Sequence, residues 1–151
     1  MLEIRPVLFA EDSPKDAELT LAALADSHLL NKITHVKDGA QVMEYLRCQG
    51  EFKDRTSGNP VVVILDVKMP RMDGIEVLRA IRTDPILKQI PVVMLTSSRE
   101  EQDVIRSYEL GVNAYVVKPV KFSDFMEAVN HLGVFWAVLN EPPPGEAPAN
   151  G

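Results

Sequence analysis

Five short apolar runs separated by helix-like segments constrain the fold of this chain more than any other feature. The runs are residues 7–10, 33–36, 61–65, 92–95 and 114–117. The third and fourth runs are continuously apolar rather than alternating, which is typical of strands buried on both faces of a parallel sheet. Strands that alternate with helices over short connections predict a doubly wound α/β fold. We therefore expect a five-stranded parallel sheet of the flavodoxin-like type, with strand order 2-1-3-4-5.

Residues that commonly cap helices mark where the intervening helices begin. Each of the first four helices is expected to follow a side chain that can accept a hydrogen bond from its first turn, namely Ser13, Asp38, Asp73 and Ser98. The last helix is expected to begin near Lys121 or Ser123. The caps thus support an alternation of strands and helices along the chain.

The length and the distribution of prolines predict one folded domain and a tail. A chain of 151 residues corresponds to one domain at roughly 150 residues each. We expect this domain to span residues 1–139, without an output domain. Residues 140–151 hold four of the eleven prolines and are expected to form a disordered tail. Residues 49–60 are polar and contain glycine, which predicts a long loop before the third strand.

Charge and hydropathy argue against several classes of protein. Sixteen basic against 22 acidic side chains give a net charge of −6, whereas a nucleic-acid interface needs a basic face. No apolar run approaches the roughly 20 residues that span a bilayer, and Glu3 and Arg5 interrupt any signal peptide at the start. The single cysteine, Cys48, excludes an internal disulfide. We expect a soluble, cytoplasmic protein that binds neither nucleic acid nor membrane.

Charged and polar side chains follow the carboxyl ends of the predicted strands, where open α/β sheets bind ligands. Glu11 and Asp12 follow the first strand and Asp66 the third. Thr96 follows the fourth strand, and Lys118 the fifth. We therefore expect three carboxylates, a hydroxyl and an ammonium group to meet at one edge of the sheet.

This set of groups is suited to phosphoryl transfer. Two like charges about 4 Å apart repel by roughly 4 kcal/mol at an effective dielectric constant near 20, so the carboxylates need a cation. Ligation by oxygen alone favours Mg²⁺. Asp66, at the end of the central strand, is placed to act as a nucleophile toward a phosphoryl group. The metal and Lys118 would neutralise charge on the transferring oxygens, and Thr96 would supply a hydroxyl donor.

These motifs, in this order, resemble those of the response-regulator receiver family of two-component signalling. They are Glu11-Asp12, Leu65-Asp66 with Met69-Pro70 and Asp73-Gly74, Leu95-Thr96-Ser97, and Lys118-Pro119. The resemblance covers residues 5–139. Other segments are similar to the small stand-alone receivers that partner phytochrome-type histidine kinases: Asp84-Pro85, Ile90-Pro91, Ser107-Tyr108, Asn113-Ala114-Tyr115 and Phe135-Trp136.

The resemblance implies a phosphoacceptor and a metal site. A kinase phosphohistidine would donate its phosphoryl group to Asp66. Asp12, Asp66 and the backbone carbonyl of Lys68 would hold Mg²⁺, and Glu11 would assist through water.

The resemblance also implies a switch and signalling partners. Thr96 and Lys118 would bind the phosphoryl oxygens, and Tyr115 would turn inward as Thr96 moves toward the phosphate. The bond between Lys118 and Pro119 would be cis. A regulator without an output domain would relay its signal by binding a histidine phosphotransfer protein, another regulator or the kinase itself, or it would serve as a phosphate sink.

The last helix has more apolar residues than one packed face requires. The stripe expected to face the core comprises Phe122, Phe125, Met126, Val129, Leu132, Trp136 and Leu139. A second stripe, formed by Ala128, His131, Phe135 and Val138, is apolar where a solvated face would be charged. An exposed apolar surface of this kind marks an interaction site. We expect a homodimer through this helix, with the alternative that the proline-rich tail folds back over it.

Other functions compete with the phosphoacceptor. A phosphatase with an aspartate nucleophile would need a general acid two residues later, where Lys68 stands, and a cap domain for which the chain has no room. A phosphorylation-independent interaction module would have no need of the acids, Thr96 or Lys118. Nucleotide binding is disfavoured because no glycine-rich loop follows the first strand.

Overall fold

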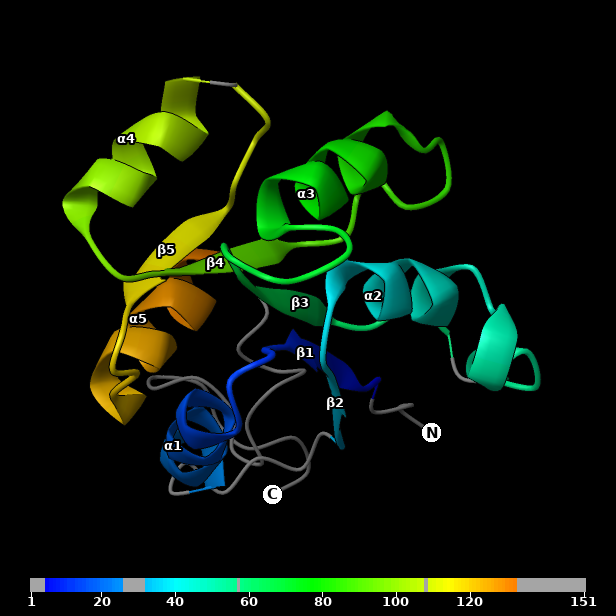
Figure 1. Cartoon of the computed structure of the whole chain (residues 1–151), viewed down its shortest axis with the longest axis horizontal. Coiled ribbons are helices and arrows are strands. Elements are labelled where there is room, and N and C mark those ends of the chain that lie inside the picture. Colours follow the sequence, from blue (N-terminus) through cyan, green and yellow to red (C-terminus); the bar gives the residue numbers. More distant parts are fainter. Residues whose placement is uncertain (1–4, 26–31, 57, 108, 133–151) are drawn as a thin grey trace, which may run out of the picture.

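Strands and helices alternate along the chain as the sequence predicts (Figure 1). We describe residues 5–25, 32–56, 58–107 and 109–132 of the computed structural model. The strands are β1 (Val7–Ala10), β2 (Ile33–Val36), β3 (Val62–Asp66), β4 (Val92–Thr96) and β5 (Ala114–Val117). The helices are α1 (Pro14–Ala25), α2 (Gly39–Leu46), α3 (Gly74–Thr83), α4 (Arg99–Ser107) and α5 (Phe122–Leu132), with a short 3₁₀ helix, η1 (Gly50–Phe52), after α2.

The strands form one parallel sheet in the order β2-β1-β3-β4-β5. This confirms the predicted flavodoxin-like fold. β3 and β4 each reach one residue further toward the carboxyl edge than expected, because Asp66 pairs with Leu95 and Thr96 pairs with Val117. The sheet therefore fixes the backbone of both Asp66 and Thr96.

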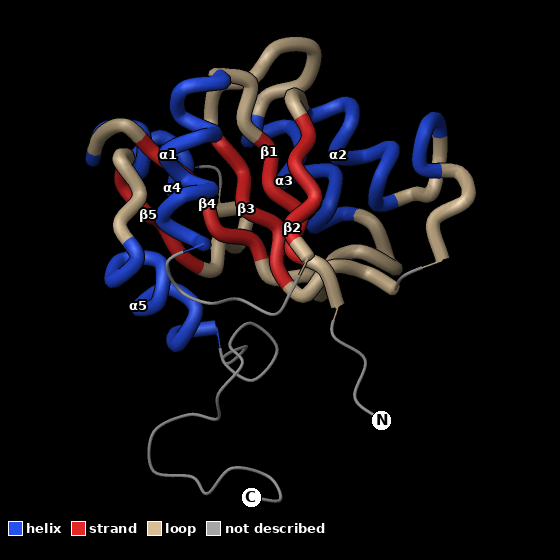
Figure 2. The backbone as a smooth tube through the Cα atoms, turned by 90° about the horizontal axis from the view of Figure 1, so that it is seen from below, coloured by secondary structure: helices blue, strands red, loops and turns tan. Residues whose placement is uncertain are grey.

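Helices cover both faces of the sheet (Figures 1 and 2). Residues of α2, α3 and α4 pack on one face, and residues of α1 and α5 pack on the other. The strand β1 shows the division, since successive side chains of a strand point to opposite faces. Leu8 and Ala10 belong to the first apolar core, whereas Val7 and Phe9 belong to the second. The sheet is thus held between two separate cores.

The helices begin where the capping residues predict. Asp38 accepts a hydrogen bond from the first turn of α2, and Asp73 forms a reciprocal capping box with Glu76 at the start of α3. The hydroxyls of Ser13 and Ser98 accept from backbone N–H groups in the first turns of α1 and α4. These side chains satisfy N–H groups that have no partner within the helix.

The described part of the predicted loop at residues 49–60 has more structure than its polar composition suggests. It contains η1, and Arg55 anchors it to the end of α2. The Arg55 guanidinium lies 4.3 Å from the centroid of the Tyr45 ring and donates to the backbone oxygen of Tyr45 at 2.9 Å. A cation held over an aromatic face is stabilising. The composition of the loop does not reveal this contact, because Tyr45 lies outside the loop, in α2.

The structure corrects the expected faces of the last helix. Ala128, predicted to lie on an exposed stripe, is buried in the core beneath α5 at 6% exposure. Phe122, predicted to face the core, is 41% exposed. The helix starts directly after Lys121, and its buried face runs through Phe125 and Ala128, one turn apart. The prediction of an interface through Ala128 is therefore wrong.

Other predictions concern residues outside the described part of the chain. The side chains of His131, Phe135 and Val138 lie there, and so do residues 140–151, which were expected to form a disordered tail. The dimer surface beyond Ala128 and the tail thus remain predictions. Among the described residues, no helix is long and apolar enough to cross a membrane.

Candidate functional site

The parallel sheet brings the predicted site residues to one edge. Glu11 follows β1 directly, Asp66 is the last residue of β3, and Thr96 is the last residue of β4. Lys118 follows β5. Because all five strands run in the same direction, their carboxyl ends lie at the same edge of the sheet, and these charged and polar residues lie there together.

The ammonium group of Lys118 is the centre of the site. Its Nζ lies 2.7 Å from Oε1 of Glu11 and 2.9 Å from Oδ1 of Asp66. A third carboxylate, that of Asp16 in the first turn of α1, accepts a hydrogen bond from Nζ of Lys118 through Oδ2 at 3.0 Å. Sequence reasoning missed Asp16 because it considered only residues between strand and helix. The sequence contains a signal for Asp16, because this acidic residue stands in the first turn of a helix that starts at the same edge of the sheet.

Three carboxylates form a cluster suited to a hard cation. Ligand oxygens of Glu11, Asp12 and Asp66 all lie within 4.8 Å of one another. Two oxygens bound to one Mg²⁺ at about 2.1 Å are separated by about 3 to 4 Å, so small side-chain movements would close the cluster on an ion. Asp12 is exposed and lines a hollow of about 570 Å³ together with Lys68. Oxygen donors, their spacing and this opening to solvent all fit a divalent cation.

The protonation of the cluster is set by burial and by Lys118. Burial raises the pKa of Asp66 to about 7; the hydrogen bond with Lys118 opposes this rise, and the negative charge of Glu11 reinforces it. Burial alone would lower the pKa of Lys118, but its carboxylate partners hold that pKa well above its ordinary value. Lys118 is therefore a permanent cation, whereas Asp66 exchanges a proton near neutral pH.

The first turn of α4 engages the end of β4. The fully buried hydroxyl of Thr96 accepts a hydrogen bond from Nε2 of Gln102 at 3.4 Å. The next N–H group, that of Ser97, donates to Oε1 of Glu101 at 2.6 Å, and Oε2 of Glu101 lies 3.6 Å from Nζ of Lys68. Neither Gln102 nor Glu101 was singled out from the sequence, because their role depends on how α4 sits on the sheet.

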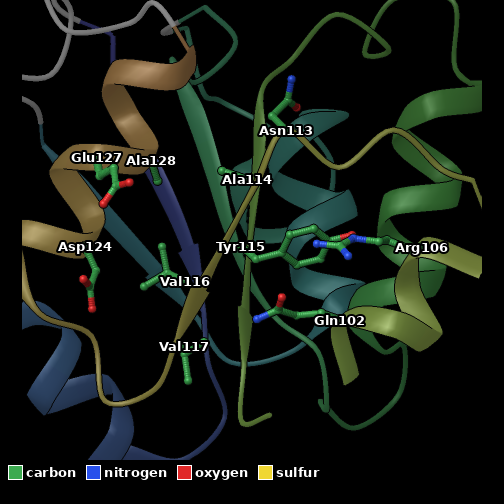
Figure 3. Close-up of a pocket in the computed structure, with 10 residues that line it drawn as sticks. All are labelled: Gln102, Arg106, Asn113, Ala114, Tyr115, Val116, Val117, Asp124, Glu127 and Ala128. Atoms are coloured by element: carbon green, nitrogen blue, oxygen red, sulfur yellow. The ribbon is translucent and has the colours of Figure 1, made fainter. Parts of the chain in front are cut away.

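Tyr115 lies on the face formed by α4, β5 and α5, beside a hollow of about 500 Å³ (Figure 3). Its half-buried ring points toward Arg106, whose guanidinium carbon is 5.4 Å from the ring centroid. Gln102 also lines this hollow, and it is the residue that donates to Thr96. Gln102 therefore connects the strand-end hydroxyl to the surface around Tyr115.

Comparison with known proteins assigns this arrangement to a family. Residues 7–130 match the response regulator receiver domain. The chain belongs to the response regulator receiver family. Glu11 and Asp12 follow β1, Asp66 ends β3 and Lys118 follows β5. The bond between Lys118 and Pro119 is cis, as expected. Receivers are signalling domains rather than classical enzymes, which argues against the phosphatase alternative.

The chain is similar over most of its length to several response regulators, two of which are named as bacteriophytochrome response regulators. The receiver is 40% identical over 130 residues to response regulator Rcp1 of Synechocystis sp., a match that covers 86% of this chain and 87% of Rcp1. It is 57% identical to the bacteriophytochrome response regulator RtBRR, with a TM-score of 0.87 over 95% of this chain and 86% of that one. The bacteriophytochrome response regulator AtBRR is 54% identical, with a TM-score of 0.88 over 93% of this chain and 100% of that one.

A solved structure of Rcp1 contains a metal ion. The Mn²⁺-bound form of Rcp1 is 39% identical to this receiver and superposes with a TM-score of 0.69, over 88% of this chain and 94% of that one. The receiver is thus a homologue of phytochrome-linked response regulators, and phosphorylation of an aspartate is typical of its family.

Proposed function

We propose that this receiver accepts a phosphoryl group on Asp66 from a histidine kinase and relays the signal through protein–protein contacts. The observation that carries the proposal is the contact of 2.9 Å between Nζ of Lys118 and Oδ1 of Asp66, at the edge where the acidic cluster gathers. A buried carboxylate with a fixed cation beside it is a suitable acceptor, because the cation can neutralise charge on the transferred group.

The transfer needs few groups from this chain. The N–P bond of the kinase phosphohistidine breaks, and a P–O bond to the ionised carboxylate of Asp66 forms. Lys118 binds an oxygen of the transferred group, and the hydroxyl of Thr96 binds another once it leaves Gln102. Because burial raises the pKa of Asp66 to about 7, a proton must leave this carboxyl group before it can attack at pH values below about 7.

Asp12, Asp66 and the backbone carbonyl of Lys68 would hold Mg²⁺, with Glu11 assisting through water. When bound, the ion supplies positive charge for the transferring oxygens. The acidic cluster, the shared hollow of Asp12 and Lys68, and the Mn²⁺-bound form of the homologous Rcp1 support this site.

Movement of Thr96 would change the surface around Tyr115. If the Thr96 hydroxyl moves toward a phosphoryl oxygen, it leaves the amide of Gln102, which lines the hollow beside Tyr115 and Arg106. The Tyr115 ring would then turn toward the space that Thr96 leaves. Such a change would give partners differential contacts with the two states, which any signal relay requires.

The proposed donor is a phytochrome-type histidine kinase, supported by the names of RtBRR and AtBRR. The proposed receiver of the signal is a histidine phosphotransfer protein, another regulator or the kinase itself. We also propose a homodimer through the end of the last helix, now without Ala128. In sedimentation, Phe135→Asp should raise the monomer fraction, and an unchanged mass would refute this interface.

Intact-mass measurement tests the phosphoacceptor directly. The protein is incubated with Mg²⁺ and acetyl phosphate, and separately with a phosphorylated histidine kinase. We expect the mass of one phosphoryl group to be gained, and Asp66→Asn to abolish the gain. Asp54→Asn, at an exposed position in the loop before β3, is the matched control and should be labelled normally. Labelling retained in Asp66→Asn would refute the assignment, and Mg²⁺ binding without labelling by either donor would favour an interaction module.

A further inference from the structure

Asp16 is the third carboxylate on Lys118, and its surroundings differ from those of the other two. Its Oδ2 lies 3.0 Å from Nζ of Lys118, yet its side chain is 40% exposed. The side chains of Glu11 and Asp66 are only 1% and 9% exposed. Asp16 also lies outside the metal-binding cluster, which comprises Glu11, Asp12 and Asp66. It is therefore linked to the site through Lys118.

Three carboxylates crowd the ammonium of Lys118; it donates a hydrogen bond to Asp16, whereas Oε1 of Glu11 contacts it as an ion pair without hydrogen-bond geometry. An ammonium group has three N–H donors, and three carboxylate oxygens lie within 3.0 Å of Nζ. A phosphoryl group on Asp66 would bring about −1.5 to −2 charges and three further acceptors to this point. For one of its oxygens to take an N–H of Lys118, one carboxylate has to give way.

Asp16 is the partner that can be displaced at the smallest cost. Withdrawing Glu11 from Lys118 would leave a buried carboxylate without its cation, which is strongly unfavourable. Asp16, by contrast, can be hydrated where it stands, because its side chain already reaches solvent. Asp16 and Lys118 both line a hollow of about 370 Å³ between α1 and the connection after β5, so there is room for the carboxylate to swing away.

We propose that Asp16 is a positioning residue that occupies Lys118 in the unphosphorylated protein and is displaced when a phosphoryl oxygen takes its N–H. The inference rests on the proposed role of Asp66 as phosphoacceptor. Asp16 acts through Lys118 and contacts neither the metal nor the phosphoryl group. Asp16 stands in α1, which packs on the face of the sheet opposite α4 (Figure 1). Phosphorylation of Asp66 would therefore break the contact through which Asp16 links α1 to Lys118.

Binding of beryllofluoride, a mimic of the phosphoryl group, measures this competition at equilibrium. Its affinity is determined by ¹⁹F NMR at saturating Mg²⁺ for the wild type, Asp16→Asn and Asp16→Ala. Asp16→Asn removes the charge and keeps the shape, and Asp16→Ala also removes the acceptor while keeping a good helix former. Because a partly exposed ion pair has to be broken in the wild type, we expect both variants to bind beryllofluoride about two- to fivefold more tightly.

Glu18→Gln is the matched control. It removes the same charge from the same helix at an exposed position two residues away, about 200° around the helix axis. Its affinity for beryllofluoride should equal that of the wild type. The dissociation constant for Mg²⁺ alone should be the same in all four proteins, whereas a merely structural role of Asp16 would weaken Mg²⁺ binding in the Asp16 variants and would not tighten the binding of beryllofluoride.

Each outcome decides the inference. An equal gain in Glu18→Gln and Asp16→Asn would assign the effect to net charge and overturn it, as would no gain in either Asp16 variant. A change in Mg²⁺ affinity as large as that for beryllofluoride would make Asp16 part of the metal site. If the wild type itself binds no beryllofluoride, or if Asp66→Asn binds it equally well, the proposed phosphoacceptor fails and the inference fails with it.

Discussion

The carboxylate of Asp38 and the guanidinium of Arg71 meet through two parallel hydrogen bonds, each 3.0 Å long. The pair joins the start of α2 to the connection that follows β3. Burial would raise the pKa of Asp38, but the hydrogen bonds from Arg71 and from the backbone of α2 bring it below its ordinary value. Arg71 has a φ of 63°, which non-glycine residues rarely adopt. The pair therefore helps to hold the segment beyond Asp66 in an unusual backbone conformation.

Substitutions of Asp38 should separate its two roles. Asp38→Ala removes both the helix cap and the pair with Arg71, and loss of the cap alone costs about 1 kcal/mol of unfolding free energy. Asp38→Asn keeps an acceptor for the cap and loses only the ionic pair, so its loss should be smaller. Arg71→Gln should match Asp38→Asn in urea denaturation. Equal losses in Asp38→Ala and Asp38→Asn would show that the cap contributes nothing.

Gly74 should not tolerate a side chain, because the backbone of Asp66 approaches it closely. A Cβ atom there would clash with the backbone oxygen of Asp66. We expect Gly74→Ala to lower the free energy of unfolding by about 1 to 3 kcal/mol, as overpacking does, and to weaken Mg²⁺ binding by moving Asp66. Gly58→Ala is the control, since its added Cβ meets nothing within 4 Å. Mg²⁺ affinity is measured by calorimetric titration and the free energy of unfolding by urea denaturation. Equal values of both quantities in the two variants would contradict this account.

Mg²⁺ affinity should increase as pH rises through about 7. The raised pKa of Asp66 means that the metal-free protein holds a proton there below about pH 7, and this proton must leave before the carboxylate can bind an ion. Above that pH the carboxylate is already ionised, so the affinity should level off. Calorimetric titrations in buffers of different ionisation enthalpy should detect proton release on the acid side. Asp66→Asn should release no proton, and an affinity independent of pH would refute the raised pKa.

Arg82 should be essential for joining α3 to the connections before β4 and β5. Its guanidinium donates to the backbone oxygens of Lys88, Ile90 and Gly111 and to Oδ1 of Asn113. Arg82→Lys keeps the charge but cannot reproduce the planar set of donors. We expect a loss of about 1 kcal/mol in unfolding free energy, because these acceptors lose hydrogen bonds to a charged group, one of them partly buried. Arg99→Lys, exposed in the first turn of α4, should leave the unfolding free energy unchanged in the same urea experiment.

The sequence predicts those parts of the site that depend on the chain order of strand ends. Asp66 and Thr96 stand at the ends of apolar runs, and a parallel sheet brings such ends together whatever the details of packing. Asp73 is likewise predicted to cap a helix, and its capping box confirms this cap. Local signals and topology sufficed for these residues.

Contacts that depend on the position of a helix on the sheet could not be predicted. Asp16 reaches Lys118 and Gln102 reaches Thr96 only because α1 and α4 are rotated and placed as they are. The error at Ala128 has the same origin, since two apolar stripes on α5 left its rotation undecided and the packing against the sheet decided it. Apolar periodicity predicts which face of a helix packs on the sheet when the helix has one apolar stripe. It cannot predict that face when the helix has two apolar stripes.

The register of the sheet restricts the backbone of Asp66. Asp66 pairs with Leu95 and Thr96 pairs with Val117, so neighbouring strands hold the backbones of both residues. We expect differences between this regulator and its relatives, in reaction timing or in choice of partner, to arise from the loops and first helical turns around this edge of the sheet. Such an arrangement lets the reaction be altered by exchanging exposed side chains around this edge without changing the sheet.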